Sequence, residues 1–192
     1  MTKPNNPDPC SNYLSDKDYL LHMIPHHQVA VDISEVLQQK SKNPVMHTIL
    51  RELLWNQNRE IIMMKDILHN LPSKISQDNV EMNRHYINTV LDFTKNASDT
   101  DAKCNPEFFN PELHKKHLSE MFLDEKTYLE HMIPHHQVAV DMSKTLLKYT
   151  KNDFIITFAY RIIRNQQNEI NYMRELLNNL NPWSWNSELI NE

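Results

Sequence analysis

The chain has 192 residues, of which 40% are hydrophobic and 23% charged, as in an ordinary soluble globular protein. Its formal net charge of −5 offers no basic surface for nucleic acid, and no apolar run reaches the roughly 20 residues that cross a bilayer. Glycine is absent, which excludes the glycine-rich loops that bind phosphates and dinucleotides.

The N-terminal stretch lacks the charged-then-apolar pattern of an export signal, so we expect a soluble and, by default, intracellular protein. Cys10 and Cys104 are the only cysteines, too few for a disulfide framework and without metal-ligand spacing. We expect free or incidental thiols, with a single bridge between the two as the alternative.

The first unit, residues 15–72, is predicted to be a helical hairpin. Ser15 is suited to cap a first helix that runs to about Lys40. Asn43, followed by proline, then opens a second helix that ends near Leu71.

Residues 73–123 are predicted to form a helical connecting segment. Apolar residues recur at helical spacing between Gln77 and Lys95, and residues 111–121 are suited to a further short helix. Between them, the Asn-Pro pairs at Asn105 and Asn110 indicate a loop.

The second unit, residues 124–182, repeats the first hairpin. Asp124 caps a helix to about Tyr149, and Asn152 opens a helix that ends near Leu180. Two hairpins, each with one apolar stripe, bury those stripes most simply against one another. We therefore predict an all-α four-helix bundle with almost no strand.

The eleven residues His22 to Asp32 occur again, unchanged, as His131 to Asp141. A shift of 109 positions aligns residues 16–71 with the second unit without a gap, and 27 of the 56 pairs are identical by count. Packing alone would accept substitutes of similar size and polarity. The duplicated segments are therefore the best candidates for function.

Each repeat carries a proline inside the predicted first helix, Pro25 and Pro134. An internal proline costs on the order of 3 kcal/mol, so the bland alternative is that the helix starts there. Tyr19 and Leu20 continue the same apolar stripe ahead of the proline, which favours one kinked helix.

Helical periodicity places polar side chains on apolar faces. His26 falls in the middle of the first helix's apolar face, with His22 and His27 at its margins. Gln57 lies at the centre of the second helix's stripe, with Glu60 at its edge. Unpaired buried polar atoms cost about 1–3 kcal/mol each, so one another, water or an ion must satisfy them.

Antiparallel pairing about the turn brings these groups to one height. The expected neighbours are His26 and His27 with Gln57, Met23 with Glu60, and Tyr19 with Met64. Asp32 projects off the apolar face, so we expect it in a surface salt bridge or in a contact that supports a ligand.

Imidazole with thioether, and without paired thiolates, is a ligand set suited to copper. Hard cations would want several carboxylates, and zinc would leave the methionines without a role. Six of the eleven histidines lie in the repeated segments. Taken alone, each such residue more often simply fills the core. The alternative for Gln57 is a hydrogen-bond partner of a histidine, and the alternative for Glu60 is a flanking charge. The intact duplication favours metal.

These motifs resemble the domain of unknown function 305 family, which is ferritin-like in fold. The hallmark is His-Met-Ile-Pro-His-His-Gln-x-Ala, followed by a helix carrying Gln-x-x-Glu-Ile-x-x-Met. Two tandem copies are present, and the middle segment is not covered. The matching residues are His22 to Ala30 with Gln57, Glu60, Ile61 and Met64, and His131 to Ala139 with Gln166, Glu169, Ile170 and Met173.

The resemblance implies copper binding and copper resistance, typically in exported bacterial proteins. It implies ten candidate ligands: His22, Met23, His26, His27, Met64, His131, Met132, His135, His136 and Met173. The groups expected to support them are Gln57, Glu60, Gln166, Glu169 and Met142. Met142 stands where the first copy has Ile33, so the second half is richer in methionine.

The leading hypothesis is a non-enzymatic protein that sequesters copper, as Cu(I) or Cu(II), or passes it on. No nucleophile with an attached base indicates catalysis. The alternatives are a structural or interaction bundle without metal and a di-metal ferritin-like oxidase, which would need more inward carboxylates. The expected partner is a metal ion, with a homo-oligomer or an unidentified protein as further alternatives, and neither nucleic acid nor a membrane.

Overall fold

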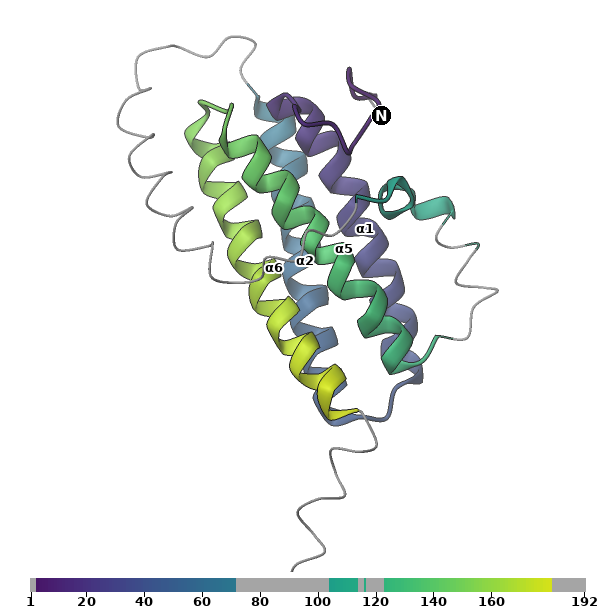
Figure 1. The fold of residues 1–192 in the computed structure, drawn as a ribbon. Coiled ribbons are helices and arrows are strands. Elements are labelled where there is room, and N and C mark those ends of the chain that lie inside the picture. Colours follow the sequence, from purple (N-terminus) through teal and green to yellow (C-terminus); the bar gives the residue numbers. More distant parts are fainter. Residues whose placement is uncertain (1–2, 72–103, 114–115, 117–122, 181–192) are drawn as a thin grey trace, which may run out of the picture.

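The computed structural model describes residues 3–71, 104–113, 116 and 123–180, and in these residues it is helical without strands. Four long helices lie side by side (Figure 1). None of the described helices combines the length and the apolar character that a membrane span requires. The elements are α1 (Asp16–Lys40), α2 (Pro44–Asn70), the 3-10 helix η1 (Pro106–Phe109), α5 (Glu125–Leu147) and α6 (Asp153–Asn179).

All four predicted caps are confirmed. The side chains of Ser15 and Asp124 accept hydrogen bonds from backbone N–H groups three residues ahead, at the starts of α1 and α5. Asn43 and Asn152 do the same two and three residues ahead, at the starts of α2 and α6. These bonds satisfy N–H groups that the first helical turn leaves without partners.

Both internal prolines lie within continuous helices, Pro25 in α1 and Pro134 in α5, as the apolar stripe predicted. The one clear boundary difference is at the end of α5, which stops at Leu147 rather than near Tyr149. Each helix therefore keeps its repeated segment in a single helical run.

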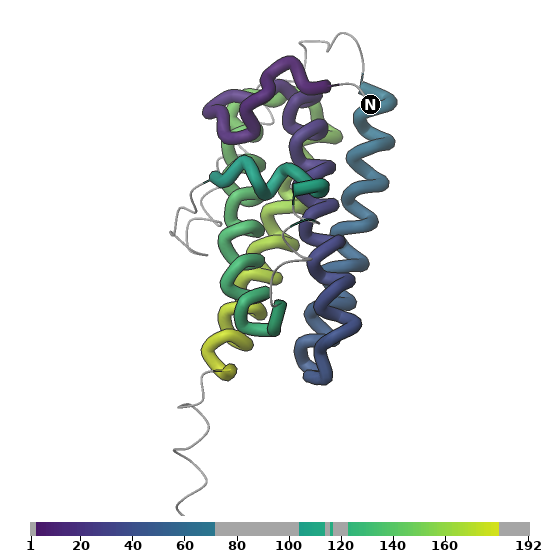
Figure 2. The backbone as a smooth tube through the Cα atoms, turned by 90° about the vertical axis from the view of Figure 1, so that its right-hand side faces the viewer, coloured from purple at the N-terminus to yellow at the C-terminus, as the bar shows by residue number. Residues whose placement is uncertain are grey.

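The helices pack as two hairpins whose faces meet. Contacts are densest between α1 and α2 and between α5 and α6, and the hairpins join through α1 with α5 and α2 with α6. Buried apolar side chains from all four helices form one core. The described part of the chain is thus a helical bundle whose centre lies between the hairpins (Figures 1 and 2).

Two buried tyrosine–serine hydrogen bonds tie the hairpins together. The Tyr19 hydroxyl lies 2.7 Å from Ser143 Oγ, and the Tyr128 hydroxyl lies 2.7 Å from Ser34 Oγ. Each serine donates its hydrogen to the carbonyl four residues earlier, so each tyrosine is the donor of the pair. Burial raises the pKa of both tyrosines above the ordinary value, which keeps them protonated as donors.

Part of the connecting segment forms the 3-10 helix η1 where a loop was predicted. Asn105 caps η1, its side chain accepting a hydrogen bond from the Glu107 backbone N–H, and η1 lies against α1. The Asn-Pro pair thus starts a helical turn instead of a loop, because the asparagine side chain supplies the cap. The predicted helix over residues 77–95 lies outside the described residues, as does most of the one over 111–121.

Cys10 and Cys104 form a disulfide, so the expectation of free thiols was wrong. The bridge joins positions 94 residues apart because the N-terminal segment and the η1 segment both lie beside α1. The backbone N–H of Asn5 donates to Asp18 Oδ1 at 2.6 Å, which fixes the N-terminal segment there. Closing so long a loop stabilises a fold mainly by restricting the unfolded chain.

Replacing Tyr128 with phenylalanine should lower the free energy of unfolding by about 1 kcal/mol, because Ser34 Oγ loses a buried donor. Tyr149→Phe is the matched control, since that side chain is 50% exposed. Urea denaturation of both variants measures the difference. Equal unfolding free energies for the two variants would contradict the assignment of the buried bond as a tie between the hairpins.

Candidate metal centre

The two repeated segments meet at the centre of the bundle. His26 of α1 and His135 of α5 stack with their ring centroids 3.8 Å apart and an interplanar angle of 31°. Both side chains are fully buried. The repeated segments of the two hairpins are therefore adjacent, with one imidazole from each in contact.

His26 is held as a neutral base. Both of its ring nitrogens are buried without a hydrogen-bond partner. Burial is the main reason that the pKa of His26 lies well below its ordinary value, and the nearby rings of His27 and His136 lower it further. A neutral imidazole keeps one nitrogen lone pair available for a ligand.

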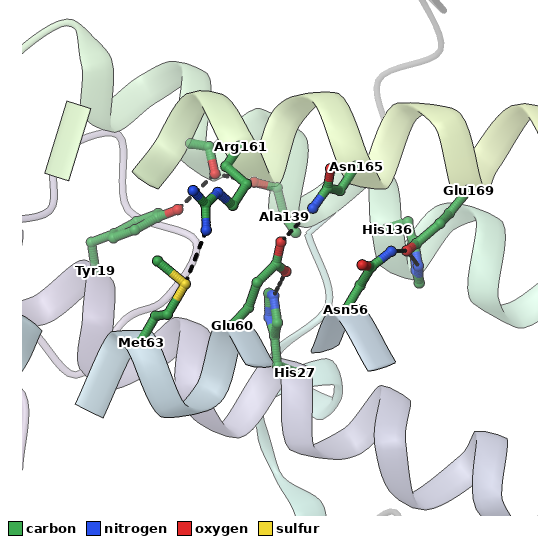
Figure 3. A network of polar contacts seen from close by, with 11 residues as sticks. Tyr19, His27, Asn56, Glu60, Met63, His136, Ala139, Arg161, Asn165 and Glu169 are labelled. Carbon is green, nitrogen blue, oxygen red and sulfur yellow. Dashed lines mark hydrogen bonds and ion pairs between the residues drawn. The ribbon is translucent and has the colours of Figure 1, made fainter. Parts of the chain in front are cut away.

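His27 and His136 each pair with a carboxylate of their own hairpin. His27 Nε2 lies 2.9 Å from Glu60 Oε2, and His136 Nε2 lies 2.8 Å from Glu169 Oε2 (Figure 3). The sequence register placed Gln57 at the height of His27, whereas the observed partner lies three residues further along α2. All four side chains are buried.

Two asparagines that sequence analysis missed reach these carboxylates from the opposite hairpin. Asn165 Nδ2 donates to Glu60 Oε1 at 2.9 Å, and Asn56 Nδ2 donates to Glu169 Oε1 at 2.9 Å (Figure 3). The available signal was their identity in the two repeats, next to Gln57 and Gln166. Periodicity alone places them beside the stripe and gives them no partner.

The two glutamines at the centre of the second-helix stripes keep polar atoms without partners. Gln57 and Gln166 are each 1% exposed. Gln57 Oε1 and both polar atoms of the Gln166 side chain are buried without a hydrogen-bond partner. The core thus contains buried polar atoms that no hydrogen bond within the protein satisfies.

The candidate methionine ligands are buried in the core, one from each long helix. Met23, Met64, Met132 and Met173 all have 0% exposure. Met142 is 7% exposed, and Ile33 at the matching position of the first hairpin is 2% exposed. The structure therefore places thioethers and imidazoles in one apolar interior.

Two phenylalanines of η1, which the sequence analysis did not single out, cover the histidines. The Phe109 ring centroid lies 4.9 Å from that of His26, and the Phe108 centroid lies 4.9 Å from that of His135. Figure 2 shows this segment, in teal, crossing over α1 and α5. The signal was an adjacent aromatic pair between two prolines, and its effect is to shield the stacked rings from solvent.

The periodicity placed His22 and His27 at the margins of the apolar face; His22 is 6% exposed, whereas His27 is fully buried. His22 Nε2 lies 2.8 Å from the Asn6 carbonyl oxygen, and His131 is half-buried with its ring centroid 5.2 Å from that of Phe108. Asp32 accepts a hydrogen bond from Gln28 on its own helix, and the second repeat does the same. These contacts lie within a single helix, and the expected surface salt bridge or ligand-supporting contact of Asp32 stays a prediction.

In the described residues, no group of three or more His, Cys, Asp or Glu side chains is arranged to hold a metal ion. One reason is that the rings of His26 and His27 are 6.0 Å apart by centroid, with the His27 Nε2 turned to Glu60. A centre made of nitrogen and oxygen ligands alone is therefore not preformed there.

The described residues define a helical-bundle protein with histidines and methionines buried in its core. The chain belongs to the family described as domain of unknown function (DUF305), whose model matches residues 16–177. A curated relative, the uncharacterized protein L153 of Acanthamoeba polyphaga mimivirus, is 48% identical over 59 residues, or 31% of this chain. The matched part spans 39% of the length of that relative.

Solved structures with this fold include the protein CopM in several forms. Its silver-bound form is 23% identical, with a TM-score of 0.59, covering 89% of this chain and 99% of that one. Its Cu(I)-bound form is 25% identical, with a TM-score of 0.58 and coverage of 87% and 98%. A DUF305 fragment from Deinococcus radiodurans is 20% identical, with a TM-score of 0.58 and coverage of 86% and 96%.

Acidification should destabilise the metal-free protein through His26. The folded pKa is lowered, so below the unfolded value of about 6.5 the unfolded chain binds the extra proton and unfolding becomes easier. This contribution to stability is complete above about pH 6.5 and is lost as the pH falls toward the folded pKa. Urea denaturation between about pH 7 and about pH 5, with a chelator present, measures it.

His26→Leu should flatten this pH dependence, because the buried imidazole is removed. His69→Leu, at an exposed position of α2, is the control and should leave the dependence unchanged. An equal loss of stability on acidification in the wild type and in His26→Leu would refute the assignment.

Proposed function

We propose that this protein binds copper, preferentially as Cu(I), in the buried histidine–methionine layer and sequesters it or passes it on without catalysing a reaction. The observation that carries the proposal is His26, a neutral buried imidazole with no hydrogen-bond partner, stacked on His135 in an interior that contains four buried thioethers.

The donor chemistry fits a soft cation. Thioether sulfur selects Cu(I), and imidazole binds either copper oxidation state. Buried polar atoms without partners cost about 1–3 kcal/mol each, a cost that a bound ion offsets. The candidate ligands remain His22, Met23, His26, His27 and Met64 with His131, Met132, His135, His136 and Met173.

The same chemistry disfavours a di-metal oxidase. Such sites need inward carboxylates free to bridge or chelate metal. The buried carboxylates Glu60 and Glu169 are each engaged on both oxygens, by a histidine and by an asparagine. We infer a ferritin-like bundle that arose by duplication of one hairpin, with a different ligand set from the oxidases.

The relatives support this choice of metal. CopM has been solved with Cu(I), with Cu(II) and with silver, and its silver-bound form has the same fold as this chain. Silver(I) and Cu(I) are both soft monovalent cations that accept sulfur and nitrogen ligands. A centre built on methionine and histidine is the kind that both ions would share.

A metal-free structural role is the second candidate. The Tyr19–Ser143 and Tyr128–Ser34 bonds favour it, because paired polar contacts across an interface fix helix register without an ion. In that case the histidines would contribute only to stability and to the uniqueness of the packing.

The combined variant His26→Ala with His135→Ala should lose Cu(I) binding, because it removes both imidazoles at the centre. Competition with a chromophoric Cu(I) chelator under anaerobic conditions, with elemental analysis of the purified protein, measures binding. His69→Ala, at an exposed histidine outside the layer, is the control and should bind as the wild type does.

A second combined variant, Met23→Leu with Met132→Leu, keeps the proposal testable if the histidine variant does not fold. Leucine nearly conserves the volume of methionine, so the cost in stability is below about 1.5 kcal/mol per site while the sulfur is removed. Copper affinity unchanged in both combined variants would end the copper proposal. A wild-type protein that does not bind Cu(I) tightly, together with lower stability of the combined variants, would instead support the structural role.

A further inference from the structure

Each hairpin contains a histidine whose two ring nitrogens have different surroundings. His27 Nε2 lies 2.9 Å from Glu60 Oε2, whereas His27 Nδ1 is buried without a hydrogen-bond partner. The second hairpin repeats this, with His136 Nε2 2.8 Å from Glu169 Oε2 and His136 Nδ1 buried and unpartnered. The two nitrogens of each ring therefore have separate roles.

The carboxylate determines which nitrogen carries the hydrogen. An ionised carboxylate only accepts, so the bond requires a hydrogen on Nε2 of His27. In the neutral ring, the lone pair then lies on Nδ1. Histidines that bind metals usually donate their other N–H to a carboxylate in this way, which fixes the tautomer and the ring orientation and makes the ligand more basic.

Each carboxylate is held in turn from the other hairpin. Asn165 on α6 donates to the free oxygen of Glu60 on α2, and Asn56 on α2 donates to Glu169 on α6, both at 2.9 Å (Figure 3). The two chains of contacts, Asn165–Glu60–His27 and Asn56–Glu169–His136, are named here the crossed relays. Each relay ends on a histidine of the hairpin opposite its asparagine.

We propose that Glu60 and Glu169 are positioning residues that present Nδ1 of His27 and His136 to the metal, and that Asn165 and Asn56 tune each half of the centre from the opposite hairpin. This inference rests on the proposed copper binding. It specifies which ring nitrogens face the ion. It also explains why neither hairpin forms its half of the centre without the other hairpin.

The first experiment needs no metal. Nitrogen-15 NMR of the histidine rings in the apo protein should show a hydrogen on Nε2 of His27 and none on Nδ1. Glu60→Gln, which keeps the side-chain shape, should change the His27 ring signals and leave those of His136 in place. A hydrogen on Nδ1 of His27 in the wild type would overturn the inference.

The second experiment uses proteins that keep only one relay. In the His136→Ala background, where the His27 relay remains, Asn165→Ala should weaken Cu(I) binding about 10-fold and Glu60→Gln about 10- to 100-fold. In the His27→Ala background, Asn165→Ala should leave affinity within about 2-fold, because its relay has already lost the histidine. Asn58→Ala, which removes an exposed bond of α2 to its own backbone, is the matched control.

The half of the centre that Asn165→Ala weakens distinguishes this inference from a local packing defect. Asn165 lies in the hairpin of His136, so simple disruption of α6 would weaken the half that contains His136. That result, or equal affinities for Glu60→Gln and its parent, would overturn the crossed relays while the copper proposal stands. A wild-type protein without Cu(I) binding would overturn the proposed function itself.

Discussion

The burial of four imidazoles between two helical hairpins is the constraint on which the rest of this structure depends. Imidazole, carboxylate and amide groups lose their water at this interface, and each must regain a partner inside the protein. Glu60 regains two, His27 from its own hairpin and Asn165 from the other. His26 regains none, and it stays neutral at the contact with His135. Hydrogen bonds therefore satisfy the carboxylates at the flanks of this interface, whereas the two ring nitrogens of His26 at its centre have no hydrogen-bond partner.

The cross-hairpin contacts come in pairs related by the shift of 109 residues. Tyr19 bonds Ser143 as Tyr128 bonds Ser34, and the two asparagine–glutamate bonds are related in the same way. Residues at matching positions of the two hairpins therefore make equivalent contacts across the interface. The contact from Arg161 to Met63 sulfur has no such twin, because Glu52 and Tyr172 occupy the matching positions (Figure 3).

Helix boundaries and buried faces could be predicted because they depend on local sequence. Ser15 and Asn43 act as caps within three residues, and the burial of His26 and Gln57 follows from helical periodicity. The hydrogen-bond partners of the buried groups could not be predicted, because they depend on how one helix is rotated about its axis and shifted along it relative to its neighbour. A shift of about one helical turn separates the expected Gln57 from the observed Glu60 as partner of His27. The Cys10–Cys104 bridge and the phenylalanine cover join segments far apart in sequence, which no local pattern encodes.

Charge balance links the buried carboxylates to the proposed cargo. A cation placed in this apolar layer loses hydration, and the cost is large unless an opposite charge lies nearby. In the proposed relays, where each carboxylate is ionised and each histidine ring is neutral, Glu60 and Glu169 supply one negative charge in each hairpin. One monovalent ion per hairpin is then compensated within its own relay, whereas a divalent ion leaves a net positive charge in the core. Within the proposed function, the carboxylates whose oxygens are engaged by a histidine and an asparagine thus favour a monovalent ion over a divalent one.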